Sequence, residues 1–106
     1  MKCNGLLFTS GQIALDPTTG TLIDGDVTAQ TRQALENLKA VLEAGGSSLE
    51  HVIKATVYLT DLNNFAKMNE VYAEYLGKVK PARSTVGVAT LPRGASVEID
   101  LVATTQ

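Results

Sequence analysis

The sequence predicts one α+β domain, in which two helices cover one face of a mixed β-sheet. Three observations lead to this class. Apolar residues recur at intervals of three and four in two stretches, 27–42 and 65–76, which is the spacing of a helix with one buried face. Two shorter stretches, 52–59 and 96–103, alternate between apolar and polar residues as strands do. The 106 residues, 44% of them hydrophobic, suit a single core, so we expect one domain over 1–106.

The chain begins with a hairpin signal followed by a strand. Asn4-Gly5 is a preferred central pair of a tight hairpin turn, yet only three residues precede it, so we expect the first strand of this hairpin to be cut short. Residues 5–10 are apolar and β-prone, and residues 12–15 continue in an extended conformation. The stretch 16–20 contains Pro, Gly and short polar residues and predicts a turn, and 21–23 predicts a short return strand.

The first helix is predicted to begin after Asp26, a good N-cap, and to end at Gly45-Gly46. Its buried stripe is spaced by three and four positions and consists of Val27, Thr31, Ala34, Leu35, Leu38, Val41 and Leu42. The polar residues between them are expected to point away from the core; these are Gln30, Gln33, Glu36, Lys39 and Glu43.

The second half of the chain repeats the change from strand to helix. The strand over 52–59 should have an apolar face made of Ile53, Ala55, Val57 and Leu59, and a mixed face made of Val52, Lys54, Thr56 and Tyr58. Capping residues at 61–64 precede the second helix, which should bury Phe65, Met68, Tyr72, Tyr75 and Leu76 and end at Gly77. Two strands follow, 83–88 and 96–103, joined through a loop at 91–94. Right-handed connections place both helices on the same face of the sheet.

The face of the sheet without helices is expected to be buried between subunits. It would carry Val52, Thr56 and Tyr58, together with one of two alternating sets from the last strand. These sets are Val97, Ile99, Leu101 and Ala103, or Ser96, Glu98, Asp100 and Val102. Such a mixed face is too apolar for bare solvent and too polar for the core of a monomer, so we expect it to contact other copies of the chain.

Composition and charge exclude several classes of function. The net charge of −2, with no block of either sign, argues against binding to nucleic acid or to an anionic membrane. Cys3 is the only cysteine, which excludes an internal disulfide, and no second histidine or cysteine stands at metal-ligand spacing from His51. The sequence has neither an apolar run near the roughly 20 residues of a membrane span nor the pattern of a signal peptide. We therefore expect a cytoplasmic protein without a metal site.

Three positions are candidates for chemistry, and each has an ordinary structural alternative. Arg83, at the start of a strand, is either a solvated strand-end residue or a guanidinium fork that holds a substrate carboxylate. Glu98 shares a strand face with Asp100. This face is either simply the solvent-exposed side of the sheet, or it is covered by another subunit, in which case Glu98 would be desolvated and could act as a general base. Ser10-Gly11 is either a turn or a hydroxyl beside exposed backbone N–H groups that contact a substrate.

Five motifs occur in order along nearly the whole chain. They are Leu7-Phe8-Thr9-Ser10-Gly11-Gln12-Ile13, the run from Val57 to Phe65, Met68-Asn69-Glu70-Val71-Tyr72, Pro81-Ala82-Arg83-Ser84 and Val97-Glu98-Ile99-Asp100. Together they resemble the Rid family of imine and enamine deaminases, of the RidA type. This family is also named endoribonuclease L-PSP or translation inhibitor.

The resemblance implies a homotrimer of the chorismate-mutase-like α+β fold, with the sheets forming a central barrel and a site between each pair of subunits. It also implies hydrolysis of reactive 2-imino or 2-enamino acids, such as 2-aminoacrylate, to 2-oxo acids and ammonia, with no cofactor. Carried over by position, Arg83 would hold the substrate carboxylate and Glu98 would position or activate the water. Ser10, Gly11 and Thr85 would contact the substrate, although Thr85 stands where the family commonly has cysteine.

A second departure concerns the start of the chain. Family members begin with a segment bearing Gly-Pro-Tyr-Ser, whose tyrosine lines the site, and this sequence starts after that segment, in agreement with the shortened hairpin.

Two rival functions stay open. A non-catalytic trimer that binds small carboxylic acids as a sensor would use Arg83 equally well, but Glu98 would repel an acid ligand unless it has catalytic work. An endoribonuclease or translation inhibitor is disfavoured by the net charge and the single histidine.

Overall fold

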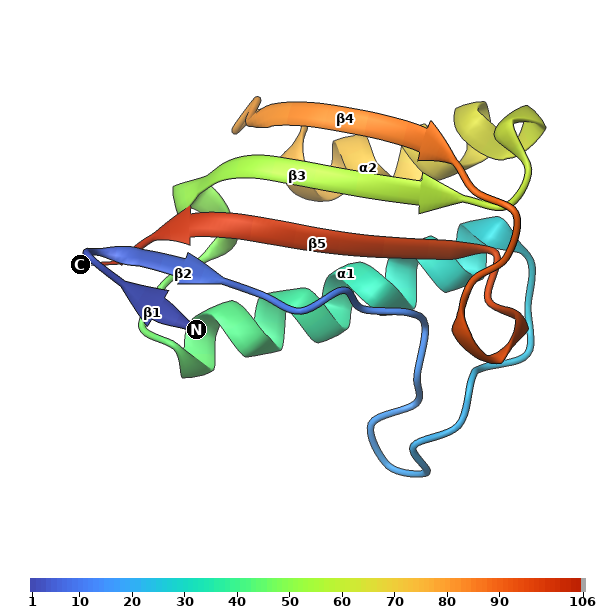
Figure 1. Cartoon of the computed structure of the whole chain (residues 1–106), viewed down its shortest axis with the longest axis horizontal. Helices are drawn as coiled ribbons and strands as arrows, with labels where there is room; N and C mark the ends of the chain where they lie inside the picture. The colour runs from blue at the N-terminus through green and yellow to red at the C-terminus, as the bar shows by residue number, and fades with distance from the viewer. Residues whose placement is uncertain (106) are drawn as a thin grey trace.

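A mixed sheet with two α-helices on one face forms the framework, which confirms the α+β class (Figure 1). The computed structural model describes residues 1–105. The strands are β1 (Lys2–Cys3), β2 (Leu6–Phe8), β3 (Val52–Leu59), β4 (Ala82–Gly87) and β5 (Val97–Thr104), and the α-helices are α1 (Val27–Ala44) and α2 (Phe65–Leu76). Short 3-10 turns lie at Leu49–His51, Leu62–Asn64 and Pro92–Gly94.

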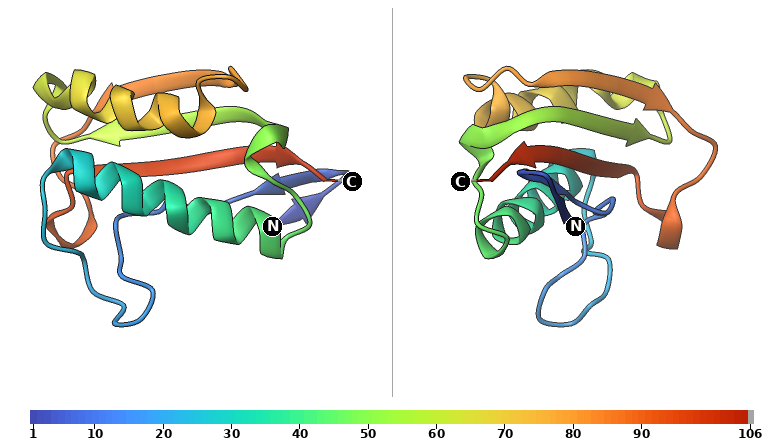
Figure 2. Two further views of the ribbon diagram at one scale, coloured as in Figure 1. Left: turned by 180° about the vertical axis from the view of Figure 1, so that it is seen from behind. Right: turned by 60° about the vertical axis from the view of Figure 1, so that its left-hand side comes forward.

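The strands lie in the order β1-β2-β5-β3-β4. β3 and β4 pair in parallel and are connected through α2, whereas the other neighbouring strands pair antiparallel. β5 therefore lies inside the sheet, between β2 and β3, and β4 forms an edge. Seen from behind, both helices lie side by side over the same face, as the right-handed connection requires (Figure 2).

The hairpin at the start of the chain forms with a first strand of two residues, β1, as short as expected. Asn4 and Gly5 both have positive φ, 51° and 80°, which is the backbone of a type I′ turn. Lys2 pairs with Leu7, and the backbone N–H of Phe8 donates to the carbonyl of Met1 at 2.8 Å. The turn signal in the sequence thus fixes the register of this edge.

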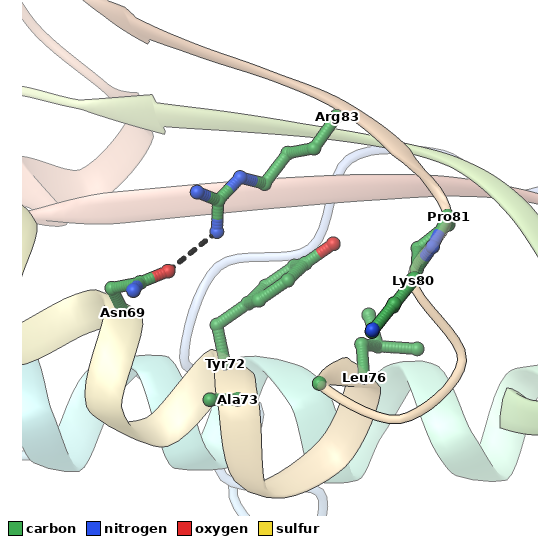
Figure 3. A pocket seen from close by; sticks show the side chains of 8 residues that line it. Asn69, Tyr72, Ala73, Leu76, Lys80, Pro81 and Arg83 are labelled. Carbon is green, nitrogen blue, oxygen red and sulfur yellow. Dashed lines mark hydrogen bonds between the residues drawn. The ribbon is translucent and has the colours of Figure 1, made fainter.

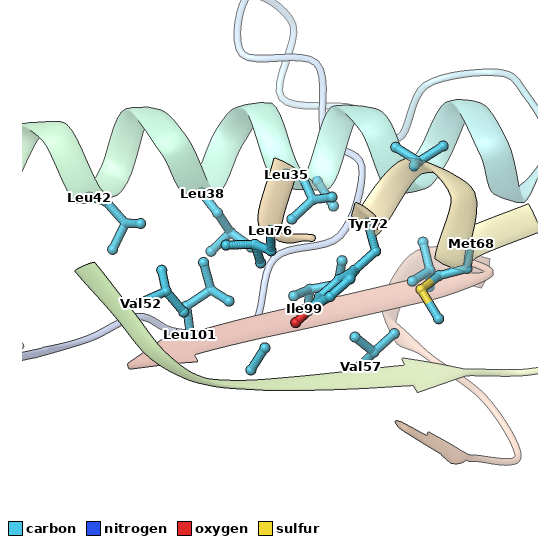
Figure 4. Packing of buried hydrophobic residues seen from close by; sticks show 14 of the residues in the cluster. Leu35, Leu38, Leu42, Val52, Val57, Met68, Tyr72, Leu76, Ile99 and Leu101 are labelled. Atoms are coloured by element: carbon cyan, nitrogen blue, oxygen red, sulfur yellow. The ribbon is translucent and has the colours of Figure 1, made fainter. Parts of the chain in front are cut away.

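The hydrophobic core lies between the helices and the sheet (Figure 4). Leu35, Leu38 and Leu42 project from α1, and Met68 and Leu76 from α2, all of them fully buried. β5 adds Val97, Ile99, Leu101 and Ala103, so the first of the two alternating sets faces the core. Glu98, Asp100 and Val102 consequently point to the face without helices, where they are half-buried.

The start of β3 differs from the prediction. Val52 is 3% exposed and belongs to the core, whereas Ile53 is 46% exposed, which reverses the expected assignment of these two residues. A shift in the pairing of β3 with β5 between Val52 and Lys54 explains the reversal, because an extra residue in one strand changes which face the following side chains occupy. From Ala55 onward the predicted alternation is correct.

Both helices contain residues that the periodicity placed wrongly. Val41 and Phe65, predicted to be buried, are 39% and 38% exposed, and Val71, which was not in the predicted stripe, is buried. Gln30 is also buried, because its side chain accepts from the backbone N–H of Ser96 at 2.9 Å and donates to the carbonyl of Gly25 at 3.2 Å. An apolar stripe cannot reveal a buried amide whose hydrogen bonds go to distant loops.

The predicted helix starts and stops hold, and one predicted strand does not form. Asp26 caps α1 by accepting from the backbone N–H of Ala29 at 3.0 Å, and α1 ends before Gly45. The stretch 21–23 contributes an isolated bridge between Leu15 and Leu22 and no strand. Neither α1 nor α2, nor any shorter helix within residues 1–105, has the length and apolar character to cross a bilayer.

Candidate active site

Arg83 points toward the helices. In the parallel pairing of β4 with β3 it lies beside Ala55, a core residue, so its side chain leaves the sheet on the helix-covered face. Its Nη1 donates to Oδ1 of Asn69 at 2.6 Å, and its guanidinium lies over the ring of Tyr72, 4.5 Å from the centroid (Figure 3). The ring of Phe65 is also close, at 5.4 Å. These three side chains of α2 fix the position of the arginine.

The spacing of the α2 residues explains why they meet Arg83 together. Phe65, Asn69 and Tyr72 are separated by four and three positions, which brings them onto one face of a helix. The 3-10 turn before the helix is held by Asp61, whose carboxylate accepts from the backbone N–H of Asn63 at 3.0 Å. Sequence reasoning missed Asn69; the signal was its place between two aromatic residues at helical spacing.

Thr85 lies on the same face of β4 as Arg83, two residues further along the strand and in register with buried Val57. Its hydroxyl is buried and has no hydrogen-bond partner among residues 1–105. The hydroxyl of Tyr72 is in the same situation. Burial raises the pKa of Tyr72, and the charge of Arg83 opposes that shift. Unpaired buried hydroxyls are uncommon, so these two groups mark a place where a bound molecule can supply the missing partner.

A cavity of about 430 Å³ lies beside Arg83, between α2 and the start of β4 (Figure 3). Its lining includes Asn69, Tyr72, Leu76, Lys80, Pro81 and Arg83. The arginine therefore faces a hollow that can hold a small molecule.

Glu98 lies on the opposite face of the sheet. On β5 it pairs with Tyr58, and its carboxylate lies against Gly11, where the Cβ of any other residue would overlap Oε2 of Glu98. Gln12 and Ile99, which follow Gly11 and Glu98 in the chain, exchange backbone hydrogen bonds of 2.8 and 3.0 Å. This pairing brings Gly11 next to Glu98. Ser10 is exposed beside this pair. Within the described chain, Glu98 makes no hydrogen bond or ion pair, so its carboxylate is available.

Two more polar side chains share this face. Tyr58 donates from its hydroxyl to the carboxylate of Asp100 at 3.2 Å. The negative charge of Asp100 is the main reason that the pKa of Tyr58 lies above its ordinary value, with burial as the second cause. Asp100 thus adds a second carboxylate to the face of the sheet that carries Glu98.

The predicted site residues form two groups. Glu98, Gly11 and Ser10 lie on the face without helices, and Arg83 and Thr85 lie on the face that the helices cover. β3 separates their strands in the sheet. A single copy of the chain therefore holds the guanidinium and the carboxylate in two separate half-sites. Elsewhere in residues 1–105, no three His, Cys, Asp or Glu side chains converge in a way that could hold a metal ion.

The fold and the fixed guanidinium define a small α+β protein with a pocket suited to an anion. The family model described as Endoribonuclease L-PSP matches residues 1–105. A RutC family protein from Pyrococcus horikoshii is 57% identical over 103 residues, which cover 97% of this chain and 82% of that protein. The mouse 2-iminobutanoate/2-iminopropanoate deaminase is 44% identical over 97 residues, which cover 92% of this chain and 72% of the mouse protein.

A solved structure leads to the same group. YyfA from Yersinia pestis, a member of the conserved Rid protein family, is 45% identical with a TM-score of 0.95, over 98% of this chain and 83% of that one. This chain belongs to the Rid family, which carries the family-model name endoribonuclease L-PSP.

Proposed function

We propose that this protein hydrolyses reactive 2-imino and 2-enamino acids to 2-oxo acids and ammonia, at a site formed between two copies of the chain. The observation that carries the proposal is the separation of Arg83 and Glu98 on opposite faces of one sheet, each in a half-site with unused hydrogen-bonding capacity. The name of the mouse relative supports the reaction.

The Arg83 half-site holds the substrate by its carboxylate. Asn69 uses one N–H of the guanidinium and Tyr72 supports its flat face, so the remaining donors of the fork are free to bind two carboxylate oxygens. The buried hydroxyl of Thr85, on the same strand face, can donate to the same substrate. A substrate fixed in this way presents its C2 atom in one orientation, which lowers the entropic part of the barrier.

The Glu98 half-site supplies water and moves protons. Water adds to C2 of the protonated imine, the C–O bond forms while the C=N π pair moves to nitrogen, and Glu98 accepts a proton from the water. Glu98 then returns this proton to nitrogen. The C–N bond breaks as the hydroxyl gives its proton back to Glu98 and its oxygen forms the carbonyl. Glu98 passes this proton to the departing ammonia, so the 2-oxo acid and ammonium leave. An enamine first takes a proton at C3 to become the imine.

The two half-sites would meet in a homotrimer. In a closed ring of identical subunits, one surface of each copy faces a different surface of the next, so Arg83 of one copy can lie opposite Glu98 of its neighbour. Light scattering should therefore give about three times the 11.2 kDa mass of one chain, and a stable active monomer would contradict the shared site.

The core has no disulfide, because Cys3 is the only cysteine, and we assign the reaction to the cytoplasm.

The direct test is a coupled assay. A pyridoxal-phosphate dehydratase releases 2-aminoacrylate, and ammonia formation is timed with wild type, with Glu98→Gln and with Asp100→Asn as the matched control on the same strand face. We expect Glu98→Gln to lower the rate by about 10² to 10⁴ and Asp100→Asn to change it little. A wild type with no activity that still binds 2-oxobutanoate would instead favour the acid-binding sensor, since the Arg83 half-site is complete within one chain.

A further inference from the structure

The cavity beside Arg83 contains a second cation. Lys80 lies at the opposite end of the cavity from the guanidinium, with the ring of Tyr72 between them (Figure 3). None of the described residues that line the cavity is acidic. Two positive charges without a negative one make a pocket that attracts an anion at each end.

Both cationic residues are attached to α2. The side chain of Arg83 is bound to Asn69, and the backbone N–H of Lys80 donates to the carbonyl of Leu76 at 3.0 Å. Asn69 and Leu76 are seven residues apart in the helix, which corresponds to roughly 10 Å at the usual rise of about 1.5 Å per residue. The contacts of the two residues with α2 thus lie about two helical turns apart.

The backbone of Lys80 gives an independent observation. Its φ is +55°, in the left-handed region that Gly and Asn adopt most easily, and the following residue is Pro81, which further restricts the residue before it. An exposed lysine in this conformation costs the fold stability without burying apolar surface. The residue that adopts this strained backbone also lines the cavity, so its charge lies at the pocket.

We propose that this pocket selects dicarboxylic substrates, that is, 2-imino acids and 2-oxo acids with a second carboxylate at the far end of a four- or five-carbon chain. The inference rests on the proposed function for the role of Arg83, which binds the carboxylate next to C2, and adds Lys80 as the group that binds the distal carboxylate. A five-carbon diacid, with its carboxyl carbons roughly 5 Å apart and a hydrogen bond of about 2.8 Å at each end, is comparable in length with the roughly 10 Å between the attachment points of the two residues on α2. The cavity of about 430 Å³ accommodates it.

The experiment compares two stable product analogues of equal chain length by calorimetry. Wild type should bind 2-oxoglutarate about tenfold more tightly than 2-oxopentanoate, which is the effect of one charge-assisted contact. Lys80→Asn removes the charge and tolerates positive φ, and it should reduce this ratio to near one. Lys78→Asn is the matched control, because Lys78 is exposed nearby but does not line the cavity, and it should keep the ratio. Equal affinities in wild type, or a ratio that survives Lys80→Asn, would overturn the proposal.

The same samples separate this inference from the proposed function. Hydrolysis of 2-iminobutanoate without a preference for 2-oxoglutarate would leave the deaminase assignment intact and reject the dicarboxylate pocket. A Lys80-dependent preference for 2-oxoglutarate without hydrolysis of any imine would support the pocket and reject the deaminase.

Discussion

The guanidinium of Arg83 lies over the ring of Tyr72, 4.5 Å from its centroid, while Asn69 accepts a hydrogen bond from its Nη1. The arginine is therefore held before any ligand arrives, which reduces the entropy that a ligand must remove on binding.

Arg83→Lys should lower kcat/KM for 2-iminobutanoate by roughly ten- to a hundredfold, although the charge is kept. A lysine cannot bind two carboxylate oxygens with a planar fork, so at least one charge-assisted hydrogen bond of about 1.5 to 3 kcal/mol is lost. Steady-state kinetics on the purified variant measure the effect. Arg93→Lys is the control, since Arg93 donates to the carbonyl of Gly20 away from both half-sites. Unchanged kinetics for Arg83→Lys would remove this residue from the site.

Gly11→Ala should reduce turnover while leaving the fold stable. The new Cβ would overlap the Glu98 carboxylate, which is the far end of a flexible side chain and can move aside, and the φ of Gly11 is outside the positive region. We expect a loss of activity of the same order as for Glu98→Gln and little change in Tm. The double variant should be no slower than Glu98→Gln alone, because both changes act on one carboxylate. Full activity in Gly11→Ala would show that the position of this carboxylate is unimportant.

Mixed assemblies should regain activity if the site is shared between subunits. Arg83→Lys and Glu98→Gln chains, refolded together in equal amounts, would form some interfaces with an intact arginine from one chain and an intact glutamate from the other. Random mixing in a ring makes about one quarter of the interfaces intact, so the mixture should reach about that fraction of wild-type activity. Activity equal to the average of the two parent variants would mean that each site lies within a single chain.

Gln30→Leu should destabilise the protein. The change leaves the backbone N–H of Ser96 and the carbonyl of Gly25 without their partners, at a cost of about 1 to 3 kcal/mol, or roughly 4 to 20 °C in Tm. Gln33→Leu is the control, because the amide of Gln33 bonds only to Asn37, one turn further along α1, and its loss should cost less than about 0.5 kcal/mol. Thermal unfolding followed by circular dichroism distinguishes the two variants.

Stability should fall at alkaline pH as the tyrosines ionise. The charge of Asp100 raises the pKa of Tyr58, and burial raises the pKa of Tyr72 and of Tyr75. A tyrosine whose pKa is higher in the folded state than in the unfolded state stabilises the fold fully below the ordinary pKa of about 10. This contribution is lost as the pH rises through the pKa of the folded state. We expect Tm to decrease above about pH 10, and to decrease less in Tyr58→Phe. Lysines ionise in the same pH range in both proteins, so the difference between wild type and Tyr58→Phe reports on Tyr58 alone. Parallel curves of Tm against pH for the two proteins would contradict the raised pKa of Tyr58.

The sequence predicted the α+β class because the two helices have strong apolar periodicity and the strands between them are short and separated by clear turns. It failed at the start of β3, where Val52 and Ile53 are both apolar and nothing in the alternation reveals the bulge. It also failed at Gln30, whose polar side chain is buried because it makes hydrogen bonds to Ser96 and Gly25 and not because it is apolar.

The candidate site was predictable in part. Arg83 and Glu98 stand out by residue type and by their place in strands, but the face that each one occupies depends on pairing with β3, which no local pattern encodes. Asn69 was missed although its helical spacing from Phe65 and Tyr72 was a signal, and Lys80 could not be found because its position depends on an unusual φ.

The central position of β5 affects how the protein folds during its synthesis. Thr9, directly after β2, accepts from the backbone N–H of Leu101 through its hydroxyl, across 92 positions of the sequence. On the ribosome, β2 can pair with β1, but its other edge stays open until β5 has been made, and β3 can pair only with β4 until then. Local helices can form during synthesis, whereas the sheet and its core close afterwards in a single late step. A nascent chain halted before Val97 would present an unpaired β3 edge and an open core, which makes it a substrate for chaperones and proteases.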